Sequence, residues 1–267
     1  EICDAAKVHE PEVNRIRRAT APKRNTLSHA NRTRDPSIAE KLYWEVFRHL
    51  QEISPGFGRF HRHDGFLSRL KREIFAIDST TLKLSLSCMD WARHRRKKAA
   101  AKTHMRLNVG TMLPTFAVVD KASHHDSKHA AALCGSLKDG DVLLADRAYL
   151  DFLYLHGLTR RGVTFVLREK ENSVWEKVGE TSCKDIRIIA DETVRPAIKG
   201  TAGKYPEPLR RVTAIVEVDG KDTAMTFITN NFKWSPRTIA ELYRARWAIE
   251  VFFKEIKQTL QLTDFVG

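Results

Sequence analysis

The chain has 267 residues, of which 42% are hydrophobic and 30% are charged, and this balance indicates a globular protein of one large or two modest domains. Its formal net charge of +13 favours a polyanionic partner, nucleic acid before a membrane surface. The sequence has no apolar run long enough to span a bilayer, no signal-peptide core in its first residues and no zinc-like cysteine spacing. These features argue against a membrane protein or a disulfide-stabilised secreted protein and favour a cytoplasmic one.

The beginning of the chain is basic. Residues 1–36 carry many arginines and few large apolar side chains. They predict either a loosely ordered arm that follows a phosphate backbone or a plain solvated tail. Because the chain begins with Glu and stops within the apolar segment LTDFVG, we expect a fragment of a longer polypeptide.

Residues 37–73 predict a helical segment. Ser37 and Glu40 have capping-box spacing at its start, so we expect a helix from there to about Ile53. A short second helix is expected near 63–72. The side chains expected to face inward on the first helix are Leu42, Val46 and Leu50.

Two apolar runs that end in an acid are the main signals between residues 74 and 167. Ile74–Ile77 run into Asp78, and Val142–Ala145 run into Asp146. Four consecutive apolar residues predict a strand buried on both faces. Either Asp taken alone could be a turn or helix-cap residue, and that alternative stays open.

Around these two strands the pattern predicts the order β-β-β-α-β-α-β. The alternating stretch 82–87 predicts a half-exposed antiparallel strand, and 105–119 predicts a third strand that is broken near Gly110 or Pro114. The basic run 93–98, together with Lys102, is expected in a connecting loop. The remaining elements are a helix at 128–137, a helix at 151–161 and a strand at 163–167.

The character of the chain changes after residue 167. Segment 168–229 predicts a β-rich insertion, because short strand-like runs alternate with turn-prone clusters. Ser235 and Pro236 then predict a helix start, and 241–262, which contains no Gly or Pro, predicts one continuous helix. The strand-like runs of the insertion lie at 186–189, 212–218 and 224–228.

The final helix carries two neighbouring stripes of side chains. At about 100° per residue, an apolar stripe lies directly beside a polar one. The apolar stripe consists of Leu242, Ile249, Phe253, Ile256 and Leu260, and the polar stripe of Tyr243, Arg246, Glu250 and Lys257. A plain surface helix with an Arg246–Glu250 ion pair is one interpretation of the polar stripe.

The spacing of the polar stripe, Tyr-x2-Arg-x3-Glu-x6-Lys, resembles the signature of the bacterial insertion-sequence 4 family of transposases. The resemblance covers roughly residues 24–267, and other pieces match the family pattern in order along the chain. These pieces are Asp78-Ser79-Thr80, Lys102-x-His104, Ala145-Asp146-Arg147-x-Tyr149 and Thr229-Asn230.

The resemblance implies a ribonuclease H-like α/β fold, in which a mixed sheet is flanked by helices and a β-rich insertion precedes the acidic helix. Asp78, Asp146 and Glu250 would then be the catalytic acids of an Asp-Asp-Glu site. They would bind two Mg²⁺ ions, for which Mn²⁺ can substitute, with Asp78 bridging both. The implied division is a basic arm (1–36), a helical segment (37–73), the first part of the core (74–167), the insertion (168–229) and the acidic helix of the core (230–267).

The chemistry explains why such a site needs three carboxylates. Attack on a phosphodiester adds negative charge, which two divalent cations can stabilise on both the attacking and the leaving oxygen. Oxygen ligands hold Mg²⁺ while leaving positions for water and phosphate. The spacing of His104, His124, His125 and Asp126 fits no tight metal motif.

The family also implies partners. These are double-stranded DNA, both transposon ends and target, and a second copy of the chain in a synaptic complex, in a bacterial cytoplasm at the nucleoid. A hairpin intermediate is implied as well. The side chains predicted to contact DNA are Tyr243, Arg246, Lys254, Lys257, Arg147, Lys102 and His104.

Two other functions stay open: another ribonuclease H-like nuclease, or an inactive DNA-binding remnant of a transposase. The insertion and the spacing of the final helix argue against the first. Trp175 and Trp234 are candidates for stacking on an unpaired base, although most tryptophans belong to a core.

Overall fold

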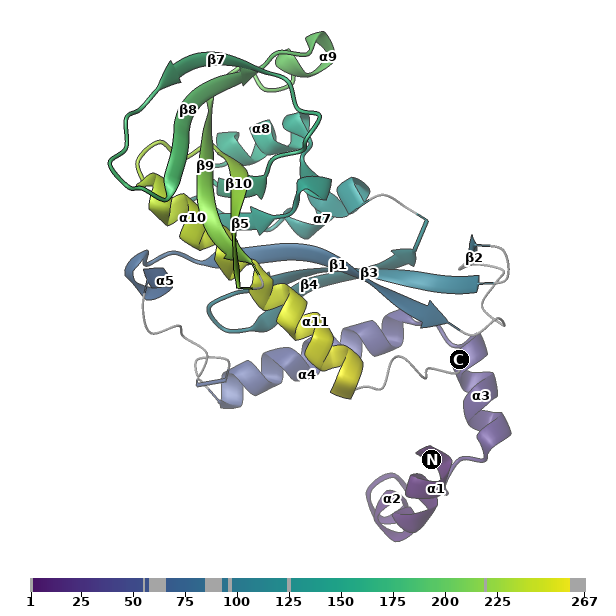
Figure 1. Ribbon diagram of the computed structural model, residues 1–267. Helices are drawn as coiled ribbons and strands as arrows, with labels where there is room; N and C mark the ends of the chain where they lie inside the picture. The colour runs from purple at the N-terminus through teal and green to yellow at the C-terminus, as the bar shows by residue number, and fades with distance from the viewer. Residues whose placement is uncertain are drawn as a thin grey trace. The chain divides into compact units, whose positions relative to one another are not determined.

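The computed structural model describes residues 2–54, 56–57, 66–84, 93–95, 98–123, 126–218 and 220–259 (Figure 1). The chain divides into two compact units, Glu1–Phe57 and Gly58–Gly267. The boundary falls inside 37–73, which the sequence pattern predicted as one helical segment. The predicted five-part division of the chain stays a prediction.

The first unit is helical. Its helices are α1 (Ile2–Val8), α2 (Glu10–Arg17), α3 (Arg24–Thr33) and α4 (Ser37–Ile53). The basic beginning of the chain therefore forms short helices and not a loosely ordered arm. In α2, Glu10 and Glu12 lie in the first turn, and Arg15 and Arg17 in the last, so the charges complement the helix dipole.

The long helix α4 has the predicted bounds, but two details of the prediction were wrong. Ser37 does not form a capping box. Its backbone N–H and its hydroxyl instead donate to the carboxylate of Asp35, two residues upstream, at 2.9 and 2.8 Å. The apolar stripe is not turned inward either. Leu42, Val46 and Leu50 expose 62%, 49% and 37% of their surface.

The second unit is built on one large mixed sheet. β1 pairs antiparallel with β3, and β3 with β4, while β1, β5 and β6 run parallel. The order β4-β3-β1-β5-β6, with the first long strand central, is the ribonuclease H-like order, so the predicted fold class is confirmed. The strands are β1 (Ile74–Leu84), β2 (Arg93–Arg95), β3 (Lys98–Asn108), β4 (Leu113–Lys121), β5 (Val142–Ala145) and β6 (Thr164–Arg168).

Three predicted element boundaries in this part were wrong. The stretch 82–87 is not a separate strand, because β1 continues through Leu84, and 85–87 lie outside the described residues. Lys102 lies within β3 and not in a loop, since β3 starts at Lys98. Residues 93–95 of the basic run that was expected in a loop form β2. The predicted break near Gly110 is confirmed, since 105–119 spans two strands and the Asn108 side-chain oxygen accepts the N–H groups of Gly110 and Thr111 in the turn between them.

Short helical elements connect the parallel strands. The predicted helix 128–137 is shorter and partly 3₁₀ in form. The helix after β5 has the predicted place, and the Asp151 carboxylate caps it by accepting the N–H of Tyr154 at 3.1 Å. A short helix also forms within the predicted range 63–72. These elements are α5 (Phe66–Arg69), η3 (Asp126–His129), α7 (Ala130–Leu133), η4 (Arg147–Tyr149) and α8 (Phe152–Arg160).

The segment predicted as a β-rich insertion does contain strands, and these strands extend the core sheet. β10 pairs antiparallel with β6, so the sheet continues as β6-β10-β9-β8-β7. The segment packs over α8, where the Trp175 ring meets the Phe152 ring edge-on at 5.6 Å (Figure 1). β7 was not predicted. The elements are β7 (Trp175–Glu180), β8 (Ile188–Pro196), α9 (Lys199–Ala202), β9 (Leu209–Val218) and β10 (Lys221–Thr229).

The C-terminal helix predicted as continuous is two helices, α10 (Pro236–Ala245) and α11 (Trp247–Thr259), with Arg246 at the junction. The predicted start is confirmed, since the Ser235 hydroxyl accepts the N–H of Thr238 at 3.1 Å. Leu260 lies outside the described residues.

Both faces of the sheet are buried at its centre. β5 shows this directly: Leu143 and Ala145 belong to the core under α7 and α8, whereas Val142 and Leu144 belong to the core under α10 and α11. Figure 1 shows α10 and α11 running along one face. The apolar stripe of the final helices packs there as predicted, with Leu242, Ile249 and Phe253 at 0%, 0% and 6% exposure. Within the described residues, no helix is both long and apolar enough to cross a bilayer.

This packing predicts the effect of a cavity under α10. We expect Leu242→Ala to lower the free energy of unfolding by about 3 kcal/mol, since the side chain is fully buried and its removal leaves a void. Leu153→Ala, at 64% exposure on α8, is the control and should change stability by less than about 0.5 kcal/mol. Urea unfolding measures both. Equal losses would show that Leu242 is not a core residue.

Candidate functional site

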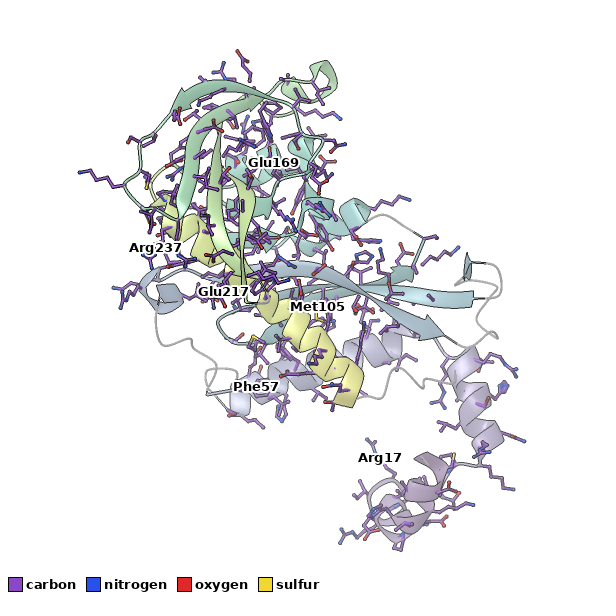
Figure 2. The ribbon with its side chains drawn as sticks, viewed as in Figure 1. Arg17, Phe57, Met105, Glu169, Glu217 and Arg237 are labelled. Atoms are coloured by element: carbon purple, nitrogen blue, oxygen red, sulfur yellow. The ribbon has the colours of Figure 1, made fainter. Side chains whose placement is uncertain are left out.

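Two predicted acids are brought together by strand pairing. β1 and β5 run parallel with Ile77 opposite Ala145. Asp78 is the next residue on β1 and Asp146 directly follows the end of β5, so the two acids lie side by side. On its other side Asp78 faces Met105 of β3, which is labelled in Figure 2. Segments far apart in the sequence therefore place two carboxylates at one point of the sheet.

The third acid reaches this point through an arginine. Arg246 donates from Nη1 to the Asp78 Oδ2 at 3.0 Å and from Nη2 to the Glu250 Oε1 at 2.5 Å. The Tyr243 hydroxyl donates to the Asp146 Oδ1 at 3.3 Å, and the Arg246 guanidinium lies 5.3 Å from the centre of the Tyr243 ring. The structure thus brings together all three acids with Tyr243 and Arg246.

A pocket of about 400 Å³ opens beside these groups. Lys254 and Lys257, two of the side chains predicted to contact DNA, line it. Thr80, Phe253 and Gln258 also line it and were not predicted as site residues. The sequence carried a signal for this side of the pocket, because Phe253, Lys254 and Lys257 follow Glu250 at spacings that place them on the same face of a helix. The full lining is Asp78, Ser79, Thr80, Glu250, Phe253, Lys254, Lys257 and Gln258.

Burial dominates the electrostatics of this site. It raises the pKa of the Asp78 carboxyl to about 6, with Glu250 and Asp146 adding to the shift and the Ser79 N–H and Arg246 opposing it. Burial also raises the pKa of the Tyr243 phenol to about 12, which keeps it protonated and able to donate to Asp146. The acids therefore form a partly desolvated negative site that favours a bound cation.

Arg246 is the cation that this structure places between Asp78 and Glu250. The three acids are linked through Tyr243 and Arg246, but in this structure no three His, Cys, Asp or Glu side chains of the described residues lie close enough together to hold a metal ion. The chemistry of Asp78, Asp146 and Glu250 nonetheless fits a divalent metal: carboxylate oxygens are the ligands that Mg²⁺ prefers, and a positive group already bridges two of them.

Three further predicted side chains, those of Arg147, Lys102 and His104, do not line this pocket. Arg147 pairs with Glu171 at 2.6 Å. Lys102 pairs with Asp126 at 3.1 Å, and the same carboxylate accepts the Ser79 hydroxyl at 2.8 Å.

His104 is buried and does not reach the pocket surface. Its Nδ1 lies 3.5 Å from the Asp126 carboxylate, and burial lowers its pKa to about 4. Its ring packs 4.3 Å from that of His129. His124 and His125 lie outside the described residues.

Residues 69–265 match the family model described as the transposase DDE domain. The chain belongs to the transposase DDE domain family. Members of this family are nuclease-type enzymes that generally use divalent metal ions.

Relatives agree with this assignment. The protein named as transposase y4zB of Sinorhizobium fredii is 31% identical over 196 residues, which cover 72% of this chain and 53% of that protein. The protein named as the transposase of insertion sequence element IS5377 of Geobacillus stearothermophilus is 26% identical, covering 86% of this chain and 68% of that protein. This transposase-family chain therefore spans between about half and two thirds of the length of these relatives.

A solved structure of the piggyBac transposase synaptic complex with hairpin DNA also matches. Its TM-score is 0.44 at 11% sequence identity, with 84% of this chain and 48% of that chain covered.

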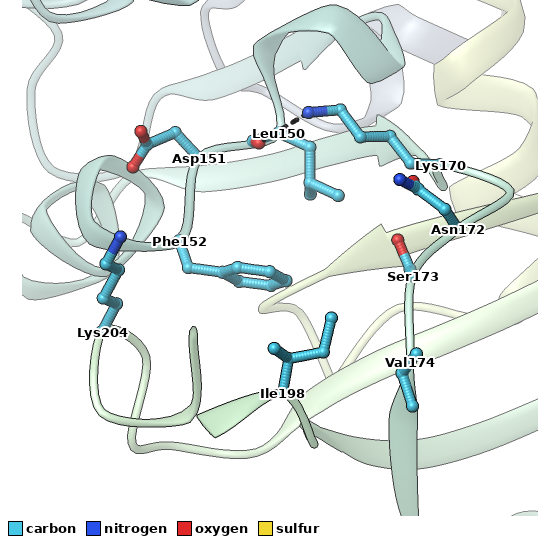
Figure 3. Close-up of a pocket in the computed structure, with 9 residues that line it drawn as sticks. All are labelled: Leu150, Asp151, Phe152, Lys170, Asn172, Ser173, Val174, Ile198 and Lys204. Carbon is cyan, nitrogen blue, oxygen red and sulfur yellow. Dashed lines mark hydrogen bonds between the residues drawn. The ribbon is translucent and has the colours of Figure 1, made fainter. Parts of the chain in front are cut away.

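A second pocket of the transposase domain lies between the start of α8, the segment before β7 and the residues on either side of α9. It has a volume of about 250 Å³, an apolar floor around Phe152 and polar groups at its rim (Figure 3). The Lys170 Nζ donates to the Leu150 carbonyl at 3.1 Å. Of the two candidate stacking residues, Trp175 packs on Phe152 and donates to Glu169, and Trp234 packs against the core under α10.

A buried ion pair fixes the start of the helices that carry the site. Arg210 of β9 makes two parallel bonds to Asp191 of β8, both at 2.7 Å. It also donates to the carbonyls of Asn231 and Trp234, at 3.2 and 2.5 Å. The insertion strands thereby hold the loop that leads into α10. No sequence motif predicted this pair.

This pair should matter for stability. We expect Arg210→Ala to cost about 3–5 kcal/mol, because it leaves Asp191 buried without its partner. Arg195→Ala, which removes an exposed arginine from β8, is the matched control and should stay within about 0.5 kcal/mol. Chemical denaturation gives both values. If the two variants unfold alike, the pair does not hold this region.

Proposed function

We propose that this chain is the catalytic domain of a DNA transposase, which cleaves phosphodiester bonds at element ends and joins the freed 3′-hydroxyl to target DNA. One observation carries the proposal: within the family-matched segment, Asp78, Asp146 and Glu250 are all held by the Tyr243–Arg246 pair of one helical junction. Three acids from distant parts of the chain are thereby linked to one helical junction beside the pocket.

In this proposal Asp78, Asp146 and Glu250 hold two Mg²⁺ ions, with Mn²⁺ as a substitute. The ions would supply the positive charge that stabilises the attacking and leaving oxygens of the phosphodiester. Lys254 and Lys257, which line the pocket beside Asp78 and Glu250, would bind neighbouring phosphates as point charges.

The remaining residues support this arrangement. Tyr243 orients Asp146 through its hydroxyl, and Arg246 offers a planar donor group to a phosphate. Arg147 lies next to Asp146 in the chain and would contact the DNA backbone. Lys102 and His104 act from behind the pocket, through the Asp126 carboxylate that also holds Ser79.

The proposed partners are double-stranded DNA and a second copy of the chain, in a bacterial cytoplasm at the nucleoid. The charge of +13 supports a polyanionic partner. Two alternatives remain. A nuclease for RNA–DNA hybrids would use the same acids but would not require element ends, and an inactive remnant would bind DNA without cutting it.

The test is to incubate the protein and Mg²⁺ with supercoiled DNA that carries the parent element's ends. Whether this DNA is cut, and whether the cuts lie at the element ends, distinguishes a transposase from the other nuclease and from the inactive remnant.

The charge predicts a steep dependence of DNA affinity on salt. Each Lys or Arg that neutralises a phosphate releases counterions, so affinity should fall as salt rises. Lys257→Ala should weaken binding and reduce the slope of log affinity against log salt by about 1. Lys184→Ala, which removes an exposed lysine of the insertion, serves as the control. Fluorescence anisotropy at several salt concentrations measures the slopes, and an affinity independent of salt would count against a DNA substrate.

The acids predict a metal-dependent gain in stability. A ligand that binds only the native state stabilises it, by about 2.7 kcal/mol at a hundredfold excess over its Kd. Millimolar Mn²⁺ should therefore raise the melting temperature of the wild type, whereas Asp78→Ala and Glu250→Ala should lose both the shift and DNA cleavage. Both variants should fold without metal, because the apolar stripe of α10 and α11 holds these helices.

The control for this experiment is Glu255→Ala, which removes an exposed acid of α11 and should keep the metal-dependent shift. A wild type without any shift, together with acid variants that melt far lower in the absence of metal, would show that Asp78 and Glu250 are structural.

A further inference from the structure

The contacts of Arg246 differ from those of the structural arginines of this chain. Arg210 holds the Asp191 carboxylate with two parallel bonds. Arg211 holds the Glu169 carboxylate in the same way and donates from its Nη1 to Glu192 as well. Arg246 instead gives one Nη to each of two acids, Asp78 and Glu250. Single bonds lack the added strength and geometric definition of the bidentate fork, so this guanidinium is held less firmly than the other two.

The surroundings of Arg246 also leave part of it unused. Its side chain is 8% exposed, and its Nε is buried without a hydrogen-bond partner among the described residues. A buried donor without a partner is costly. One of its two acids, Glu250, exposes 52% of its side chain and lines the open pocket together with Lys254 and Lys257. One of the two acids that hold Arg246 is therefore accessible from the pocket and from solvent.

We propose that Arg246 is an exchangeable counter-ion of the acid site: its guanidinium and a divalent metal compete for Asp78 and Glu250, and a DNA phosphate at the pocket takes up the guanidinium that the metal displaces. This inference rests on the proposed function, since it requires that the acids bind metal and that the pocket receives DNA. The inference adds a coupling between metal binding and DNA binding, which the proposed function does not itself require.

The coupling follows from charge. Without DNA, a metal ion must displace a cation that already satisfies two of its three ligands, so the free protein binds metal weakly. A phosphate offers the guanidinium another anionic partner, and the carboxylates are then free for metal. By thermodynamic linkage, metal must strengthen DNA binding by the same factor as DNA strengthens metal binding.

The first test is Mn²⁺ binding to the DNA-free protein by isothermal titration calorimetry. Arg246→Gln removes the competitor and should bind Mn²⁺ at least about 5-fold more tightly than the wild type, the lower end of typical coupling. Lys257→Gln removes a cation from the same pocket but leaves both bonds of Arg246 in place, so it should gain clearly less. Equal or weaker binding by Arg246→Gln overturns the proposal.

Two further variants keep this test decisive. If Arg246→Gln does not fold, Arg246→Lys replaces it: an ammonium lacks the planar fork that spans two acids, so this variant should also bind Mn²⁺ more tightly than the wild type. Asp78→Asn separates the two hypotheses. If Asp78→Asn loses Mn²⁺ binding while wild type and Arg246→Gln bind equally, the acids hold metal and only the exchange fails; if Asp78→Asn binds like the wild type, the proposed function fails as well.

The second test measures the affinity for a short DNA duplex with and without Mn²⁺ at constant ionic strength. The wild type should gain about 5-fold with metal, and Arg246→Gln should gain much less. Asp78→Asn reports the general effect of Mn²⁺ on DNA binding and is subtracted. A wild-type gain no larger than that of Arg246→Gln would overturn the exchange.

Discussion

The parallel pairing of two buried strands is the constraint on which the rest of the site depends. Because Ile77 lies opposite Ala145, the carboxylates of Asp78 and Asp146 must lie side by side at the edge of a core that excludes water. Like charges in such a place are unfavourable unless a cation compensates them, and burial, with smaller additions from Glu250 and Asp146, raises the pKa of the Asp78 carboxyl although Arg246 opposes the shift. Helices α10 and α11 provide the cation, since Arg246 at their junction donates to Asp78 and Glu250.

The parts of the fold that local sequence determines were predictable. The strands that carry Asp78 and Asp146 were visible as apolar runs, and the start of α10 as a Ser-Pro pair. The break between the two helices at Arg246 was not predictable, because no Gly or Pro marks it in the sequence. Even in the structure the φ and ψ of Arg246, −57° and −31°, are helical. The joining of the insertion to the core sheet could not be predicted either, since the pairing of β10 with β6 is a non-local contact that leaves no periodic signal.

The residues of the candidate site likewise include some that the sequence predicted and some whose surroundings only the fold reveals. The resemblance supplied Asp78, Asp146, Glu250, Tyr243 and Arg246, and the fold brings these five together. Lys102 and His104 were predicted from a local match, and the alternation of β3 explains where they lie: residues two apart share one face of a strand, and this face turns to Asp126. The acid that receives them lies on a separate element, η3, so no spacing within the strand could have revealed it.

The insertion links the second acid to the third. β5, which ends at Asp146, pairs with β6, and β6 pairs with β10. Next to β10, the Arg210 of β9 holds the loop before α10 through two carbonyls. A shift of these strands would therefore move Tyr243 and Arg246 relative to Asp146. A separate inserted domain would make no such contacts. The strands of this insertion instead belong to the same sheet as the two Asp residues and hold the start of α10, at whose end Arg246 lies.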